Sequence, residues 1–156
     1  MNTPATVTPA TVHVLFETLN THDANRAVQY VGPAYHGVDA TRSALTVGRD
    51  DARDDIHAGL TAFPDAVFTI ERCVAESSYA SVYWVMEGTH KASFLNVLTT
   101  HQPVSVSGTG LFTVEDGQIL HAVHLWDLAG LMRSAGLLPD LLSGSAAPGG
   151  SSGPEE

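Results

Sequence analysis

The first part of the chain places its apolar residues at helical spacing. Between Thr8 and Asn20 they recur every three or four positions, at Val12, Leu15, Phe16 and Leu19. This spacing predicts one face of an amphipathic helix that begins at Thr8-Pro9, with a hydroxyl cap and a proline in the first turn. A second helix is expected from Asp23 to about Val31, and a third from Arg49 to about Ala62. The segment Tyr35 to Thr46 is expected to be irregular, or short and extended.

After Pro64 the period changes from helical to alternating, which is typical of strands. Four strands are expected, over residues 68–74, 79–90, 104–114 and 118–126. The Glu115-Asp116-Gly117 turn joins the last two as a hairpin. A short helix should follow from Leu128 to Ala135 and end at Gly136. Three helices followed by an antiparallel meander indicate an α+β domain, in which a strongly bent sheet and the helices enclose a pocket.

The length of 156 residues suits one domain. We expect a flexible arm over residues 1–8, a single folded domain over 9–142, and a disordered tail over 143–156. The tail is rich in Gly, Ser and Pro and has little apolar surface to bury.

Charge and composition narrow the classes of partner. Seven Lys and Arg residues stand against seventeen Asp and Glu, and no basic cluster exists, so nucleic acid would be repelled. Only 15% of residues are charged, which suggests that a second subunit covers part of the surface, and a homodimer is expected. The single Cys73 fits a reducing compartment. With no visible secretion signal and no apolar run of membrane-spanning length, we expect a cytoplasmic protein that does not insert into membranes.

One carboxylate lies in a largely apolar stretch. Asp127 follows Trp126 at the end of the last predicted strand, directly before the apolar segment 128–132. A low-dielectric environment there would raise the pKa of Asp127 toward the range useful for proton transfer. The alternative is that Asp127 caps the helix that follows, where its carboxylate accepts amide protons and its pKa falls.

Six short motifs occur in the order and near the spacing of a known family. They are Phe16-Glu17-Thr18-Leu19-Asn20, Ala62-Phe63-Pro64-Asp65, Glu87-Gly88-Thr89-His90, Thr100 with Pro103-Val104, Asp116-Gly117-Gln118-Ile119, and Trp126-Asp127-Leu128-Ala129-Gly130-Leu131 leading to Gly136. Through these motifs the stretch from about Val12 to Pro139 resembles the SnoaL-like polyketide cyclases, within the nuclear-transport-factor-2-like superfamily.

The resemblance implies a cone-shaped α+β barrel, often dimeric, with a hydrophobic pocket for an aromatic polyketide or a similar molecule. It also implies that Asp127 is the general acid/base of an aldol-type ring closure that needs neither a metal nor an organic cofactor. Ring closure by opening an epoxide is a second possibility in this superfamily. Epoxide hydrolases, isomerases and non-catalytic small-molecule-binding proteins share the fold, so these functions stay open as alternatives.

Three residues are candidates to assist Asp127 in catalysis: His90, Tyr83 and His101. His90 ends a strand, where it either positions a substrate oxygen or bonds to the backbone. Tyr83 lies mid-strand. If it faces the pocket, it can donate a hydrogen bond to a carbonyl or enolate, and otherwise it packs in the core or at a dimer interface. His101 lies in a loop, either over the pocket or exposed to solvent.

A further set of residues is expected to line the pocket or its rim and to bind the substrate: Tyr35, His36, His121, Phe16, Phe94 and Trp126. Strand alternation places His121 on the face of Asp127, and Trp126 on the opposite face, unless a bulge near the strand end breaks the phase. His121 and His124 point to opposite faces for the same reason, so they cannot share a metal ion, and no metal site is expected.

Overall fold

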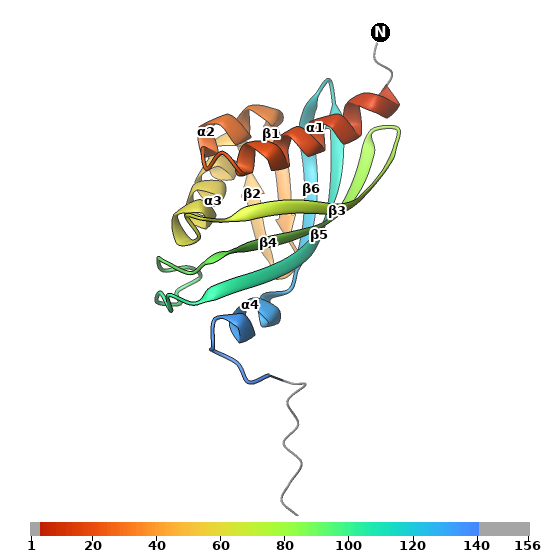
Figure 1. Ribbon diagram of the computed structural model, residues 1–156. Helices are drawn as coiled ribbons and strands as arrows, with labels where there is room; N and C mark the ends of the chain where they lie inside the picture. Colours follow the sequence, from red (N-terminus) through yellow and green to blue (C-terminus); the bar gives the residue numbers. More distant parts are fainter. Residues whose placement is uncertain (1–3, 141–156) are drawn as a thin grey trace, which may run out of the picture.

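The computed structural model describes residues 4–140, and Figure 1 shows how its helices and strands are arranged. The helices are α1 (Pro4–Leu19), α2 (Ala24–Ala27), the 3-10 helix η1 (Val28–Tyr30), α3 (Gly48–Ala62) and α4 (Leu128–Ser134). The strands are β1 (Val31–Asp39), β2 (Ala44–Val47), β3 (Val67–Glu76), β4 (Tyr79–Thr89), β5 (Pro103–Glu115) and β6 (Gln118–Trp126). No helix among residues 4–140 is both long and apolar enough to cross a membrane.

All six strands form one sheet in the order β2-β1-β6-β5-β4-β3. The pairing of β1 with β6 is parallel and every other pairing is antiparallel. Figure 1 shows a strongly bent sheet, with α1 and α3 on one side of it. The expected α+β class and the curved, mainly antiparallel sheet against N-terminal helices are therefore confirmed. The sheet is open between its edge strands β2 and β3, so it does not close into a full barrel.

The inner face of the sheet carries the core. Helix α1 lies against β3, and its apolar face buries Val12, Leu15 and Phe16. The Phe16 ring meets Phe68 and Phe112 edge to face, with ring centroids 6.3 Å and 6.4 Å apart. Aromatic pairs in this geometry contribute roughly 0.5–1.5 kcal/mol beyond the apolar area that they bury. Helix α3 lies against β1, and the short α4 lies against β5.

One local prediction is wrong, and one alternative that the sequence left open is decided. Helix α1 begins at Pro4, so Thr8 is not its N-cap; the Thr8 hydroxyl instead donates to the backbone oxygen of Ser77 at 2.8 Å. For the segment Tyr35 to Thr46 the extended alternative is found, because it contributes most of β1 and β2. Strand β1 forms because it pairs with β6, which lies some 85 positions further along the chain, and such non-local pairing leaves little trace in the local pattern.

Other local predictions hold. Asp23 caps α2, because its side chain accepts hydrogen bonds from the backbone N–H groups of Asn25 and Arg26. The helix it starts is shorter than expected and passes through η1 into β1. Helix α3, the four later strands and α4 lie within one or two residues of their predicted ends. The predicted tail, 143–156, lies outside the described residues.

Candidate active site

Between the helices and the inner face of the sheet lies a hollow made of two adjoining cavities of about 190 Å³ and 270 Å³. We call it the central hollow. The two cavities have several lining residues in common: Leu19, Asp39, Arg42, Asp55, Ile56 and His124. Aromatic and aliphatic side chains form most of the remaining wall, with Phe16, Phe112 and Ile119 at one end and Phe68, Trp84 and Met86 at the other. A few polar groups in an apolar cleft are the usual composition of a small-molecule site.

Asp39 and His124 are the polar pair on the sheet side of this hollow. They lie opposite each other in the parallel pairing of β1 with β6, and both line both cavities. The backbone N–H of Ala40 donates to the His124 carbonyl oxygen at 2.8 Å, which holds the two strand ends together. The pair thus consists of a carboxylate and an imidazole on one face of the sheet.

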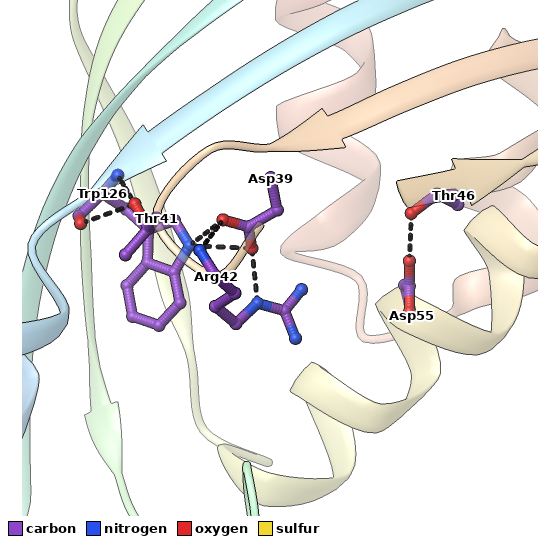
Figure 2. Close-up of polar contacts among 6 residues, drawn as sticks. All are labelled: Asp39, Thr41, Arg42, Thr46, Asp55 and Trp126. Atoms are coloured by element: carbon purple, nitrogen blue, oxygen red, sulfur yellow. Dashed lines mark hydrogen bonds and ion pairs between the residues drawn. The ribbon is translucent and has the colours of Figure 1, made fainter. Parts of the chain in front are cut away.

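Asp39 is held as a carboxylate by two neighbours (Figure 2). The indole Nε1 of Trp126 donates to its oxygens at 3.0 and 3.1 Å, and Arg42 donates from Nε at 2.5 Å and from its backbone N–H at 3.2 Å. Burial, which leaves the side chain 12% exposed, by itself raises the pKa of Asp39. The hydrogen bonds from Trp126 and Arg42 and the charge of Arg42 outweigh that effect, so the pKa of Asp39 lies below its ordinary value.

Thr41 fixes Trp126 from the turn between β1 and β2. Its hydroxyl accepts a hydrogen bond from the Trp126 backbone N–H at 2.7 Å and donates one to the Trp126 carbonyl at 3.0 Å (Figure 2). This two-way contact ties the turn to the last residue of β6. Because the Trp126 backbone is fixed in this way, its indole is held where Nε1 can donate to Asp39.

His124 is the group in this pair that can take up a proton. Burial lowers the pKa of His124; the charge of Asp39 acts in the opposite direction, and that of Arg42 lowers it further, leaving a net decrease. Its ring meets Phe112 edge to face, with centroids 5.5 Å apart. This direction favours the uncharged imidazole at neutral pH, which is the form required of a general base.

A second polar group brings together Tyr35 of β1 and Asp55 of α3. Tyr35 is buried and lines the central hollow, and burial followed by the charge of Asp55 raises its pKa to about 12. Asp55, on α3, accepts a hydrogen bond from the Thr46 hydroxyl at 2.5 Å (Figure 2). Tyr35 therefore keeps its proton through the physiological range and can only act there as a neutral phenol.

The sequence of residues 10–135 matches the family model of the SnoaL-like polyketide cyclases. The chain belongs to this family. No protein among those with curated descriptions matches the chain by sequence.

Solved structures share the fold of this SnoaL-like protein. One is a protein assigned as a SnoaL-like polyketide cyclase from Jannaschia sp. CCS1, with 21% identity and a TM-score of 0.78 over 89% of this chain and 98% of that one. AclR of Streptomyces galilaeus, assigned as a hydroxylase, has 21% identity and a TM-score of 0.76 over 87% and 89%. IdmH of Streptomyces antibioticus, assigned as a polyketide cyclase, has 19% identity and a TM-score of 0.72 over 82% and 97%.

Asp127 lies outside the central hollow. Its Oδ1 accepts the backbone N–H of Gly130 at 2.7 Å and so caps α4, and its side chain is 49% exposed with Arg133 Nη2 at 3.8 Å. The expectation of a low-dielectric environment for Asp127 is therefore wrong, and the helix cap left open by the sequence is the arrangement found. The alternation along β6 explains this, because the inward-facing residues are Ala122, His124 and Trp126, while His121 is exposed on the other face.

Of the other candidates, some line the central hollow and the rest lie outside it. Tyr35, Phe16, Phe94 and Trp126 line the central hollow, as expected. Tyr83 is 46% exposed on the outer face, while its neighbour Trp84 lines the hollow. Of the two directions that the sequence left open for Tyr83, the outward one is therefore found. His36, His101 and His121 are exposed and do not line the hollow. His90 is buried, but it lines a separate cavity beside α4.

Four ionisable residues of the hollow were not singled out as site residues from the sequence: Asp39, Arg42, Asp55 and His124. For His124 a signal existed, since it shares a strand face with Trp126, the aromatic residue already expected in the pocket. No such signal existed for Asp39 and Arg42. Asp39 ends β1 and Arg42 lies in the turn after it, and β1 is placed by its pairing with the distant strand β6.

Proposed function

We propose that this SnoaL-like protein is a cofactor-independent cyclase that closes a ring in a polyketide-like or similar natural-product intermediate, with His124 as the general base. The observation that carries the proposal is that an imidazole and a carboxylate, the latter hydrogen-bonded by Trp126 and Arg42, lie opposite each other on paired strands and face one apolar hollow. Family membership and the assignment of IdmH as a polyketide cyclase support the reaction class.

In this proposal His124 removes a proton from a carbon next to a substrate carbonyl. The resulting enolate attacks a second carbonyl of the same molecule, so one carbon–carbon bond forms and the second carbonyl oxygen becomes an alkoxide. The imidazolium then returns its proton to that oxygen. The negative charge of Asp39 stabilises the imidazolium between these steps, and a positioned base of this kind contributes roughly 10²–10⁴-fold in rate. The same base could instead deprotonate an internal hydroxyl that opens an epoxide.

The wall of the hollow indicates the class of substrate. It offers aromatic side chains such as Phe68 and Trp84 for flat apolar rings, and polar groups only around Asp39 and the phenol of Tyr35. A largely apolar, oxygenated molecule would therefore bind with its reacting carbonyls toward His124. Closing the ring in a site with little water protects the enolate from simple protonation by solvent.

The proposal is tested by ring closure of an aromatic polyketide that carries a 1,3-dicarbonyl side chain. The product is followed by chromatography, and deuterium uptake at the acidic carbon in D₂O is measured as the rate above that of the uncatalysed exchange. His124→Gln should reduce kcat by about 10²-fold or more, whereas the cap variant Asp127→Asn should retain most activity. Activity should rise with pH through the lowered pKa of His124 and then stay level, because only the neutral imidazole is active.

Two results would contradict the proposal: full activity in His124→Gln, or loss of ring closure in Asp127→Asn with binding and folding unchanged. The second result would return the proton transfer to Asp127. Tight substrate binding to the unmodified protein, without ring closure and without deuterium uptake above the uncatalysed rate, would instead support a non-catalytic binding protein.

A further inference from the structure

A separate, smaller cavity of about 140 Å³ lies between α4 and the loop that follows β4. We call it the α4 cavity. Its wall is apolar apart from the ring of His90, and it has Phe63, Phe94 and Leu131 in common with the central hollow. These three side chains form the partition between the two spaces. Neither Asp39 nor His124 lines the α4 cavity.

His90 presents a buried donor beside this cavity. The residue is 3% exposed, and its Nδ1 lies 3.3 Å from the backbone N–H of Thr100 and 3.1 Å from the Thr100 hydroxyl oxygen. A backbone N–H can only donate, so Nδ1 accepts and the proton of the neutral imidazole resides on Nε2. Within residues 4–140, Nε2 has no hydrogen-bond partner. A buried N–H without an acceptor is uncommon and calls for an occupant that supplies one.

The backbone and the ring of His90 are both held in place. Its backbone carbonyl accepts from the Thr99 hydroxyl at 2.7 Å and from the backbone N–H of His101 at 2.9 Å, and its own N–H donates to Gln102 at 3.0 Å. The Phe63 ring lies against the imidazole with centroids 5.5 Å apart. A donor fixed in this way loses little freedom when it binds an acceptor.

We propose that the α4 cavity binds a small apolar molecule, or the end of a larger one, that carries a single carbonyl oxygen, with His90 Nε2–H as the donor to that oxygen. An apolar cavity of roughly 150 Å³ accommodates a benzene-sized ring, so a six-membered ring fits the space. The site is independent of the proposed ring closure, because its groups are separate from the His124–Asp39 pair.

The test uses two matched probes, cyclohexanone and methylenecyclohexane, which differ only in whether the exocyclic atom can accept a hydrogen bond. Each is titrated into the full chain labelled with ¹⁵N, and the histidine side-chain nitrogens are followed by NMR. Cyclohexanone should shift the His90 Nε2–H signal downfield in a saturable manner and leave His124 unchanged. Methylenecyclohexane should enter the cavity without that shift.

Three variants locate the effect. Ala135 is buried and lines the α4 cavity, so the larger side chain of Ala135→Leu would fill the cavity. This variant should weaken cyclohexanone binding at least tenfold. Ala58→Leu makes the same change at an exposed position of α3 and should leave binding unchanged. If Ala135→Leu does not fold, Met132→Phe narrows the same cavity and should weaken binding in the same direction.

The proposal is overturned if saturating cyclohexanone leaves the His90 signal unmoved, if both probes produce the same shift, or if the cavity-filling variants bind as tightly as the unmodified protein. It is equally overturned if a single ordered water on Nε2 is the only occupant that a ligand-soaked crystal shows. None of these results bears on ring closure, because that activity is read out through His124 and the central hollow.

Discussion

Replacing Trp126 by Phe should remove a hydrogen bond to a nearly buried carboxylate while keeping an aromatic ring at the end of β6. The indole Nε1 donates to Asp39 at 3.0 and 3.1 Å, and Arg42 alone would remain as a partner. A hydrogen bond to a charged group contributes about 1.5–3 kcal/mol, so we expect the free energy of unfolding at pH 7 to fall by about that amount, plus a smaller packing loss.

The pH dependence of the stability loss in Trp126→Phe distinguishes the contribution of the hydrogen bond from that of packing. The folded-state pKa of Asp39 lies below 3.8, so ionised Asp39 stabilises the fold above pH 3.8. That stabilisation is lost as the pH falls through the lowered folded-state pKa. Trp126→Phe moves the folded-state pKa back up, so the gap in stability between the variant and the unmodified protein should shrink as the pH drops below about 4.

The assay is urea unfolding followed by circular dichroism at pH 7 and at several values below pH 4, with Trp84→Phe as the matched control. Trp84 also lines the hollow and meets Phe68 with ring centroids 6.0 Å apart, and no carboxylate is among its described contacts. The control should therefore lose packing energy by a similar amount at every pH. A stability gap for Trp126→Phe that stayed constant with pH, as in the control, would refute the role assigned to Nε1.

Three further predictions follow from the same geometry. Asp127→Ala should lower the free energy of unfolding by about 0.5–2 kcal/mol, measured in urea, because α4 loses its cap, while ligand binding in the central hollow is unchanged. In an ultraviolet titration, the tyrosinate signal that Tyr35→Phe removes should appear with a pKa of about 12, and Asp55→Asn should lower that value. We propose that the expected homodimer pairs through the outer face of the sheet, where Leu111 and Leu125 are exposed. Leu111→Arg should then lower the sedimentation coefficient in analytical ultracentrifugation from that of a dimer to that of a monomer, and an unchanged coefficient would argue against this interface.

Local sequence determined most of the secondary structure. The spacing of apolar residues in α1 and α3, the Asp23 cap and the hairpin between β5 and β6 each depend on neighbours within a few positions. The same holds for Asp127, where the choice between an acid in an apolar pocket and a helix cap was visible in the sequence. Only the structure decided between them, because the cap requires α4 to start at Leu128 with its amides toward the carboxylate.

Tertiary structure decided the site. The alternation along β6 divides its residues into two faces, but it does not say which face the helices cover. That choice decides whether His121 or His124 faces the hollow. Asp39 and Arg42 reach the hollow because β1 pairs with β6 in parallel and the turn after it is tied to Trp126 by Thr41. Pairing between segments so distant in the chain depends on how the whole sheet assembles. The sequence therefore indicated the family and its elements, while the assembled sheet determined which polar residues face the hollow.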